Sequence, residues 1–257
     1  MLADSHAHLH AYGDAAVAGM LARAFRAGVG TIVAVSVDLA SAERTIKLAG
    51  RYASVVAAVG LHPAQLEAIP FEERWLALER LAEAPEVEAI GECGVDETEA
   101  KTTGMVQLAV FARHCRLAVR LGKPLLLHLV GEALIPAALG TLAATGVPAE
   151  RAVVHYFAGD AAVAQRYLEA GLLISVGKPV TRPENAALRE AVRAVPLDRL
   201  LLETDTYPLP GRTTEPSDLR LVADAVAELK GLSPEQVAAA TTANLERLLH
   251  PAPPDAA

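Results

Sequence analysis

Seven residues of the types that bind divalent metal ions come at or just after the ends of short apolar runs. They are His6, His8, His62, Glu92, His128, His155 and Asp205. Imidazole nitrogens combined with carboxylate oxygens suit zinc, manganese or similar ions better than a thiolate site does. Such ions lower the pKa of bound water toward neutral pH, so this set of residues predicts metal-assisted hydrolysis.

The local sequence around four of these residues supports a shared site. His6 and His8 are two residues apart on an expected strand, so their side chains point to one face, as two ligands of one ion require. Glu92 follows a strand and lies between two glycines, which lets the backbone turn sharply while the carboxylate projects and could bridge two ions. Asp205 ends an apolar run, where a buried acid is costly unless it is paired or bound to metal.

Three other histidines, His10, His114 and His250, fall in an expected loop, a helix and the C-terminal tail. We expect no common site for them. Any single histidine is usually an ordinary hydrogen-bonded residue, because histidine is only moderately buried on average. The metal-site prediction therefore depends on five histidines recurring at strand ends.

The elements that must position these side chains alternate between apolar strands and helical segments of Ala, Leu, Arg and Glu. This alternation is typical of βα units around a parallel sheet. Periodicity alone does not distinguish a closed barrel from an open doubly wound sheet, but a barrel brings every polar strand end to one mouth. We therefore expect a single (β/α)8 TIM barrel with an extra C-terminal helix, with helix caps at Ser41, Thr103 and Asp160. The expected strands are residues 2–6, 31–36, 54–60, 87–91, 124–128, 151–155, 172–176 and 199–203.

The 257 residues have a formal net charge of −8 and are 52% hydrophobic, which is enough for one large core. We expect one domain over residues 1–250, a disordered tail over 251–257, and a monomer. The acidic charge argues against a broad basic face for nucleic acid. Cys93 and Cys115 are too few for a disulfide framework, so we expect packed thiols and a cytoplasmic protein. No apolar stretch approaches the roughly 20 residues that span a membrane.

Taken together, the motifs resemble those of the TatD-type deoxyribonucleases, a branch of the amidohydrolase-like metal-dependent hydrolases. The resemblance covers roughly residues 2–249. It rests on the segments 4–9, 60–63, 91–96, the run ending at His128, 155–159 and 203–205, with 210–212 and 242–248 similar to the closing segments of the family.

The resemblance implies two divalent ions, which could be zinc, manganese or magnesium. His6, His8 and Asp205 would hold one ion, His128 and His155 would hold the other, and Glu92 would bridge them. In the implied mechanism Asp205 also orients or deprotonates the attacking water, and His62 and Asp96 contact substrate or water.

Several positions differ from the usual pattern of the family. Ala64 replaces a histidine, Leu129 and Val130 replace a Ser-Arg pair, Glu97 replaces an aromatic residue, and Leu108 replaces an arginine. Arginine is a natural phosphate clamp. The motifs and these differences leave three alternative functions. They are a TatD-like deoxyribonuclease acting on DNA ends or single strands, a hydrolase of a small ester, lactone, amide or phosphoester, and a binding module with structural ions. The first is the leading hypothesis.

Overall fold

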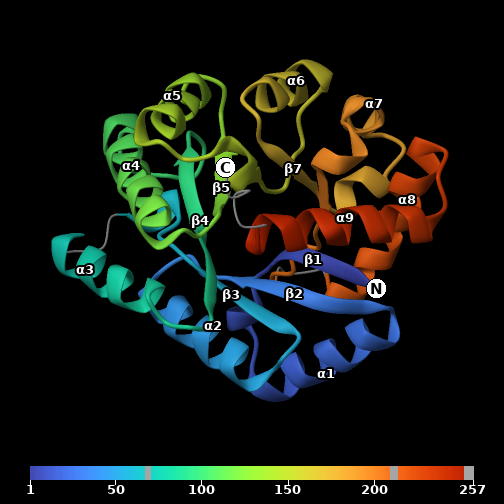
Figure 1. Cartoon of the computed structure of the whole chain (residues 1–257), viewed down its shortest axis with the longest axis horizontal. Helices are drawn as coiled ribbons and strands as arrows, with labels where there is room; N and C mark the ends of the chain where they lie inside the picture. Colours follow the sequence, from blue (N-terminus) through green and yellow to red (C-terminus); the bar gives the residue numbers. More distant parts are fainter. Residues whose placement is uncertain (67–70, 209–213, 252–257) are drawn as a thin grey trace, which may run out of the picture.

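Eight parallel strands form one sheet in which each strand pairs with the next in the chain (Figure 1). This computed structural model describes residues 1–66, 71–208 and 214–251. The sheet closes because Ala7, at the end of the first strand, bridges in parallel to Thr206, and the His8 N–H donates to the Thr206 carbonyl at 2.9 Å. The closed (β/α)8 barrel is confirmed, and the open sheet is excluded. The strands are β1 Leu2–Ala7, β2 Val29–Val35, β3 Val55–Val59, β4 Val87–Asp96, β5 Leu125–Val130, β6 Ala152–Val154, β7 Leu173–Val176 and β8 Leu200–Leu202.

A helix follows each strand, and together these helices surround the barrel (Figure 1). They are α1 Asp14–Arg26, α2 Leu39–Arg51, α3 Phe71–Ala82, α4 Gly104–Leu121, α5 Ile135–Thr145, α6 Ala161–Glu169, α7 Ala186–Ala194 and α8 Leu219–Lys230. The caps at Thr103 and Asp160 are present, since each side chain accepts a backbone N–H of the first turn. The cap at Ser41 is wrong, because Asp38 caps α2 and Ser41 is the third residue of the helix, where it completes the capping box.

The expected C-terminal helix is α9, Pro234–Leu249, which lies across one end of the barrel (Figure 1). Its Leu245, Leu248 and Leu249 pack with residues near the strand starts, including Ala3 and Val153. Burial of such apolar side chains is the main source of folding stability. Because α9 covers the N-terminal end of the strands, the C-terminal end is left for a functional site.

The largest departure from the expected strands concerns β4, which continues five residues past the predicted end at 91. Pairing with β5 goes on through Cys93 opposite Leu127 and Asp96 opposite Val130. Glu92 therefore lies within the strand and not after it. Glycine on either side of Glu92 does not end a strand whose backbone still finds a partner.

Both cysteines are free and buried, and burial raises the pKa of the Cys115 thiol to about 12, so the prediction of packed thiols is confirmed. None of the described helices is both long and apolar enough to cross a membrane. The expected disordered tail lies outside the described residues, except for Pro251. Arg212, in the segment 210–212, also lies outside them.

Candidate metal centre

The barrel brings the predicted ligands together at the C-terminal end of its strands. His6 lies in β1, Glu92 in β4 and His128 in β5. His8 and His155 directly follow a strand, and Asp205 comes three residues after the end of β8. Most of them line one cavity of about 610 Å³. The predicted residues that line it are His8, His62, Glu92, His128, His155 and Asp205.

His6, His8 and Asp205 form the first group of candidate ligands. The two Nε2 atoms of the histidines are 3.3 Å apart, and the His8 Nε2 is 3.3 Å from the Asp205 Oδ1. Asp205 has a φ of 46°, which is uncommon for a non-glycine residue, and its N–H donates to the His6 carbonyl at 3.0 Å. This turn holds the carboxylate beside the two imidazoles. One ligand atom from each residue can therefore surround one ion.

His128 and His155 form the second group, on the other side of Glu92. The Glu92 Oε1 lies 2.7 Å from the His128 Nδ1 and 2.6 Å from the His155 Nε2. The Glu92 Oε2 lies 3.4 Å from the His6 Nε2 and 3.6 Å from the His8 Nε2. Each oxygen of one buried carboxylate thus faces a different pair of histidines, as a bridging ligand requires.

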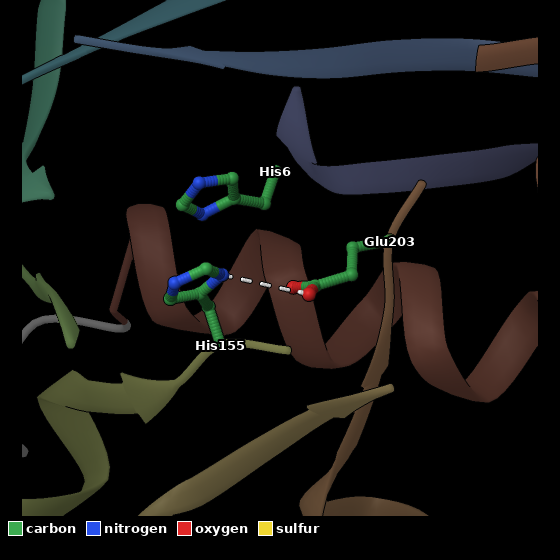
Figure 2. Close-up of side chains that lie close together, drawn as sticks. All are labelled: His6, His155 and Glu203. Carbon is green, nitrogen blue, oxygen red and sulfur yellow. Dashed lines mark ion pairs between the residues drawn. The ribbon is translucent and has the colours of Figure 1, made fainter. Parts of the chain in front are cut away.

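Carboxylates also lie behind the second pair of histidines. The His128 Nε2 is 2.9 Å from the Asp96 Oδ2, and the His155 Nδ1 is 3.6 Å from the Glu203 Oε1. Figure 2 shows the pair of His155 and Glu203, with the His6 ring stacked on that of His155 at 4.0 Å between centroids. A carboxylate hydrogen-bonded to a metal-binding imidazole fixes its tautomer and orientation, and Asp96 has this relation to His128. Among the described residues, the His155 Nδ1 has no hydrogen-bond partner and meets Glu203 as an ion pair.

Glu203 was not among the predicted site residues, although the sequence shows an apolar strand that runs into two acids. The side chain is fully buried, and its Oε1 accepts the Tyr156 N–H at 2.5 Å. Its Oε2 has no hydrogen-bond partner. One ligand atom from each of His6, His155 and Glu203 lies within 4.8 Å of the others, so Glu203 belongs to the same polar cluster as His155.

Asp96 occupies a different place from the one expected for a substrate ligand. Its Oδ1 accepts the Thr98 N–H and hydroxyl, both at 2.7 Å, and the Glu99 N–H at 2.9 Å. Since Oδ2 faces His128, both oxygens are engaged. This geometry fits a residue that positions His128 better than one that touches substrate.

His62 points its free ring nitrogen into the cavity. The His62 Nδ1 accepts the Ala64 N–H at 3.1 Å, which leaves Nε2 facing Glu92 Oε1 at 3.6 Å. Burial lowers the pKa of His62 to about 4, so this imidazole is neutral at physiological pH. Because Nδ1 accepts, the proton of the neutral ring lies on Nε2, which can donate one hydrogen bond to a substrate.

Electrostatics favour an ionised Glu92 carboxylate. Burial would raise the pKa of Glu92, but the charges of His155 and His6 hold it well below its usual value. Burial would lower the pKa of His155, but Glu92 and Glu203 raise it well above the ordinary value. The carboxylate is therefore charged, and a metal ion that binds here displaces protons from the imidazoles.

The three histidines expected outside the site have different environments. His114 is buried in α4, where its Nε2 accepts the Leu61 N–H at 3.1 Å, and His250 is an exposed residue 3.1 Å from Glu88. His10, however, lies beside the site, with its ring 5.5 Å from that of His8. The short turn after β1 folds back toward the mouth. His10 still belongs to none of the candidate ligand groups among the described residues, and its Nδ1 lies 2.9 Å from the Val35 carbonyl oxygen.

The close approach of β4 to β5 requires glycine two residues after Glu92. Gly94 has a φ of +146°, and a Cβ atom built there would lie 2.1 Å from the His128 carbonyl oxygen. Any side chain at this position would push β5, and His128 with it, away from Glu92. Here glycine serves a close backbone contact within a strand.

Comparison with known proteins identifies the family. A model of the family described as TatD-related DNase matches residues 3–250. The metal-dependent hydrolase TatD of Mycobacterium tuberculosis is 38% identical, with 96% of this chain and 97% of that protein covered. The 3'-5' ssDNA/RNA exonuclease TatD of Citrobacter rodentium is 32% identical over 89% of this chain and 90% of that protein. The crystal structure of the TatD homologue YjjV of Escherichia coli has a TM-score of 0.86 at 27% identity, with 98% of each chain covered. The chain belongs to the TatD-related DNase family and is a metal-dependent hydrolase.

Proposed function

We propose that the protein is a deoxyribonuclease that hydrolyses phosphodiester bonds at the ends of DNA or in single strands, with two divalent ions bound at the barrel mouth. The observation that carries this proposal is the placement of the two Glu92 oxygens, each facing its own pair of histidines. The relative from Citrobacter rodentium, an exonuclease of single-stranded nucleic acid by its description, supports the substrate.

Each proposed ligand residue is assigned to one of the two ions or to both. His6, His8 and Asp205 would hold one ion, His128 and His155 would hold the other, and Glu92 would bridge them. Zinc, manganese and magnesium are the candidates, because the set mixes nitrogen and oxygen donors. When bound, such ions supply Lewis acidity and lower the pKa of water.

The residues of the chain itself position the reactants. Burial would raise the pKa of Asp205, but the hydrogen bond and charge of His8 lower it to about 2, so the carboxylate is ionised. We propose that Asp205 orients the attacking water and accepts its proton. His62 would donate a hydrogen bond from Nε2 to a phosphate oxygen, while Asp96 and Glu203 hold the two imidazoles in place.

All six proposed ligands come from one chain, which supports a monomer. The two cysteines are free and buried, which supports a cytoplasmic location. The test of the function uses metal-stripped protein with zinc, manganese or magnesium restored. We expect cleavage of single-stranded DNA that falls as salt rises, because phosphate contacts release counterions. A protein that binds metal tightly yet cleaves neither DNA nor a generic phosphodiester would contradict the proposal.

A further inference from the structure

The cavity beside the proposed metal ligands has one wall of apolar side chains. We define this apolar wall as Val130, Ile135, Phe157, Val163 and Tyr167, all of which line the cavity. Val130 comes two residues after His128 on β5, so both side chains lie on the same face of the strand. The wall therefore lies next to the place where a scissile bond would be held.

Charge at the same cavity does not favour an anion beyond the metal ligands. Among the described lining residues, Glu99 and Glu132 add negative charge at the rim, and there is no Lys or Arg. A phosphate placed there would meet like charge without a cation from these residues, whereas an uncharged group would not. The half-buried Val130 and Val163 instead offer contact area to an apolar group.

The size of the cavity suits a small molecule. Its volume of about 610 Å³ lies inside the range of roughly 300 to 1,000 Å³ that is typical of small-molecule sites. Such sites combine mainly apolar walls with a few polar groups that fix orientation. Here the polar groups are His62 and the proposed ligands, which lie together beside the apolar wall.

We propose a second activity at this site, the hydrolysis of small uncharged carboxylic esters whose alcohol is aromatic or a branched apolar group. The alcohol part would pack on the apolar wall. The oxygen of water bonds to the carbonyl carbon, and the bond from that carbon to the alcohol oxygen breaks. The electron pair stays on the alcohol oxygen, which takes up the proton that Asp205 received from water. The products are a carboxylic acid and an alcohol, and the step rests on the metal-dependent hydrolase proposed above.

The experiment compares two substrates that share one leaving group, p-nitrophenyl butyrate and bis(p-nitrophenyl) phosphate. The first is uncharged and the second is an anion, so the same metal-loaded enzyme is tested on both. We expect turnover of the butyrate that requires metal, is lost in Glu92→Ala and does not change with salt. Butyrate hydrolysis that survives in Glu92→Ala would overturn the inference, because it would arise outside this site.

Variants of the wall locate the bound group. Val130→Arg should lower kcat/KM for the butyrate by at least about tenfold, since it puts a charge into the apolar wall. The same variant should lower kcat/KM for the diester less, because the arginine that disturbs the shared nitrophenyl group also attracts the phosphate. Val119→Arg is the matched control, because Val119 is 46% exposed on α4 and does not line the cavity. Equal loss on both substrates in Val130→Arg would contradict a specific role for the wall.

A binding measurement tests the apolar wall without requiring turnover of a substrate. Calorimetry of metal-free protein with 4-methylphenol should show binding that Val130→Arg weakens by about tenfold and Val119→Arg does not change. Val163→Arg on α6 is a second wall variant, used if Val130→Arg does not fold. If the diester is cleaved but the butyrate is not, the inference is wrong and the proposed function stands. If neither substrate is cleaved, the proposed function itself fails.

Discussion

The Oε1 atom of Glu92 lies 2.7 Å from the Nδ1 atom of His128, at the point where β4 and β5 run side by side. The same imidazole faces Asp96 with its other nitrogen, 2.9 Å away. One ring therefore joins the proposed bridging carboxylate to a carboxylate that fixes its orientation. The first two predictions concern these two acids.

Replacing Glu92 by Gln should release metal and stop hydrolysis. The amide keeps the size of the side chain but removes the charge that faces both pairs of histidines, so a bridge can no longer form. We expect metal affinity and kcat to fall by more than about 100-fold, beyond the effect of losing an outer-shell partner. Calorimetric titration and the phosphodiester assay measure the two quantities. Full activity in Glu92→Gln would exclude a binuclear centre bridged at this position.

Replacing Asp96 by Asn should weaken metal binding without abolishing it. Asp96 touches His128 and the backbone of the following turn, so its loss frees the imidazole to rotate. Loss of such an outer partner costs about 10- to 100-fold in metal affinity or activity. Glu73→Gln, at an exposed position on α3, is the matched control for the lost charge. An affinity equal to that of the control would show that Asp96 does not position His128.

Removing the metal should lower the stability of the whole protein. Ions that bind only the folded chain stabilise it by about 2.7 kcal/mol when their free concentration is 100 times Kd. Without the ions, only protons bound to the buried histidines can balance the negative charge of Glu92. We expect a lower melting temperature in chelator, restored by added ion in a concentration-dependent way. A melting temperature that does not respond to zinc, manganese or magnesium would count against a site formed by the fold.

Stability should also depend on pH through His114, which is separate from the proposed ligands. Burial lowers the pKa of His114 to about 4, against about 6.5 in an unfolded chain. As pH falls from about 6.5 to 4, the unfolded chain takes up this proton before the folded one, so stability is lost in that window. The loss at pH 5 is about 2 kcal/mol.

Urea unfolding at pH 7.5 and pH 5 checks the contribution of His114. The change between the two pH values should be about 2 kcal/mol smaller in His114→Gln than in the wild-type protein, because the variant lacks the titrating group. Comparing the two proteins cancels the contributions of the other histidines. An identical pH dependence in both would contradict a neutral, buried imidazole at this position.

The strands and the predicted ligand set could be read from the sequence because both depend on local pattern. Apolar runs of four to six residues identify the strands wherever both faces of a strand are covered. Polar residues at the ends of such runs point to one mouth once the sheet is taken as a barrel. The bridging role of Glu92 was implied by the resemblance to the family, and the expected strand ended one residue before Glu92, whereas β4 continues to Asp96.

Other features of the site depended on contacts between distant segments. Continued pairing with β5 extended β4 past Glu92, and the contact of His10 with the Val35 carbonyl of β2 holds its ring beside the site. Asp96 gained its place behind His128 from the pairing of β4 with β5, whereas Glu203 meets His155 from a segment after β8 that lies two strands away from β6. A local pattern does not encode these approaches, because they depend on the twist and closure of the whole sheet.

The sequence by itself determined the order of βα units and the chemical types available at the barrel mouth. Only the tertiary structure decided which nitrogen of each imidazole faces Glu92, and which apolar side chains form the wall beside it. The physical reason is that residue type and spacing set what a segment can do, whereas distances of about 3 Å between side chains far apart in the chain arise only from packing.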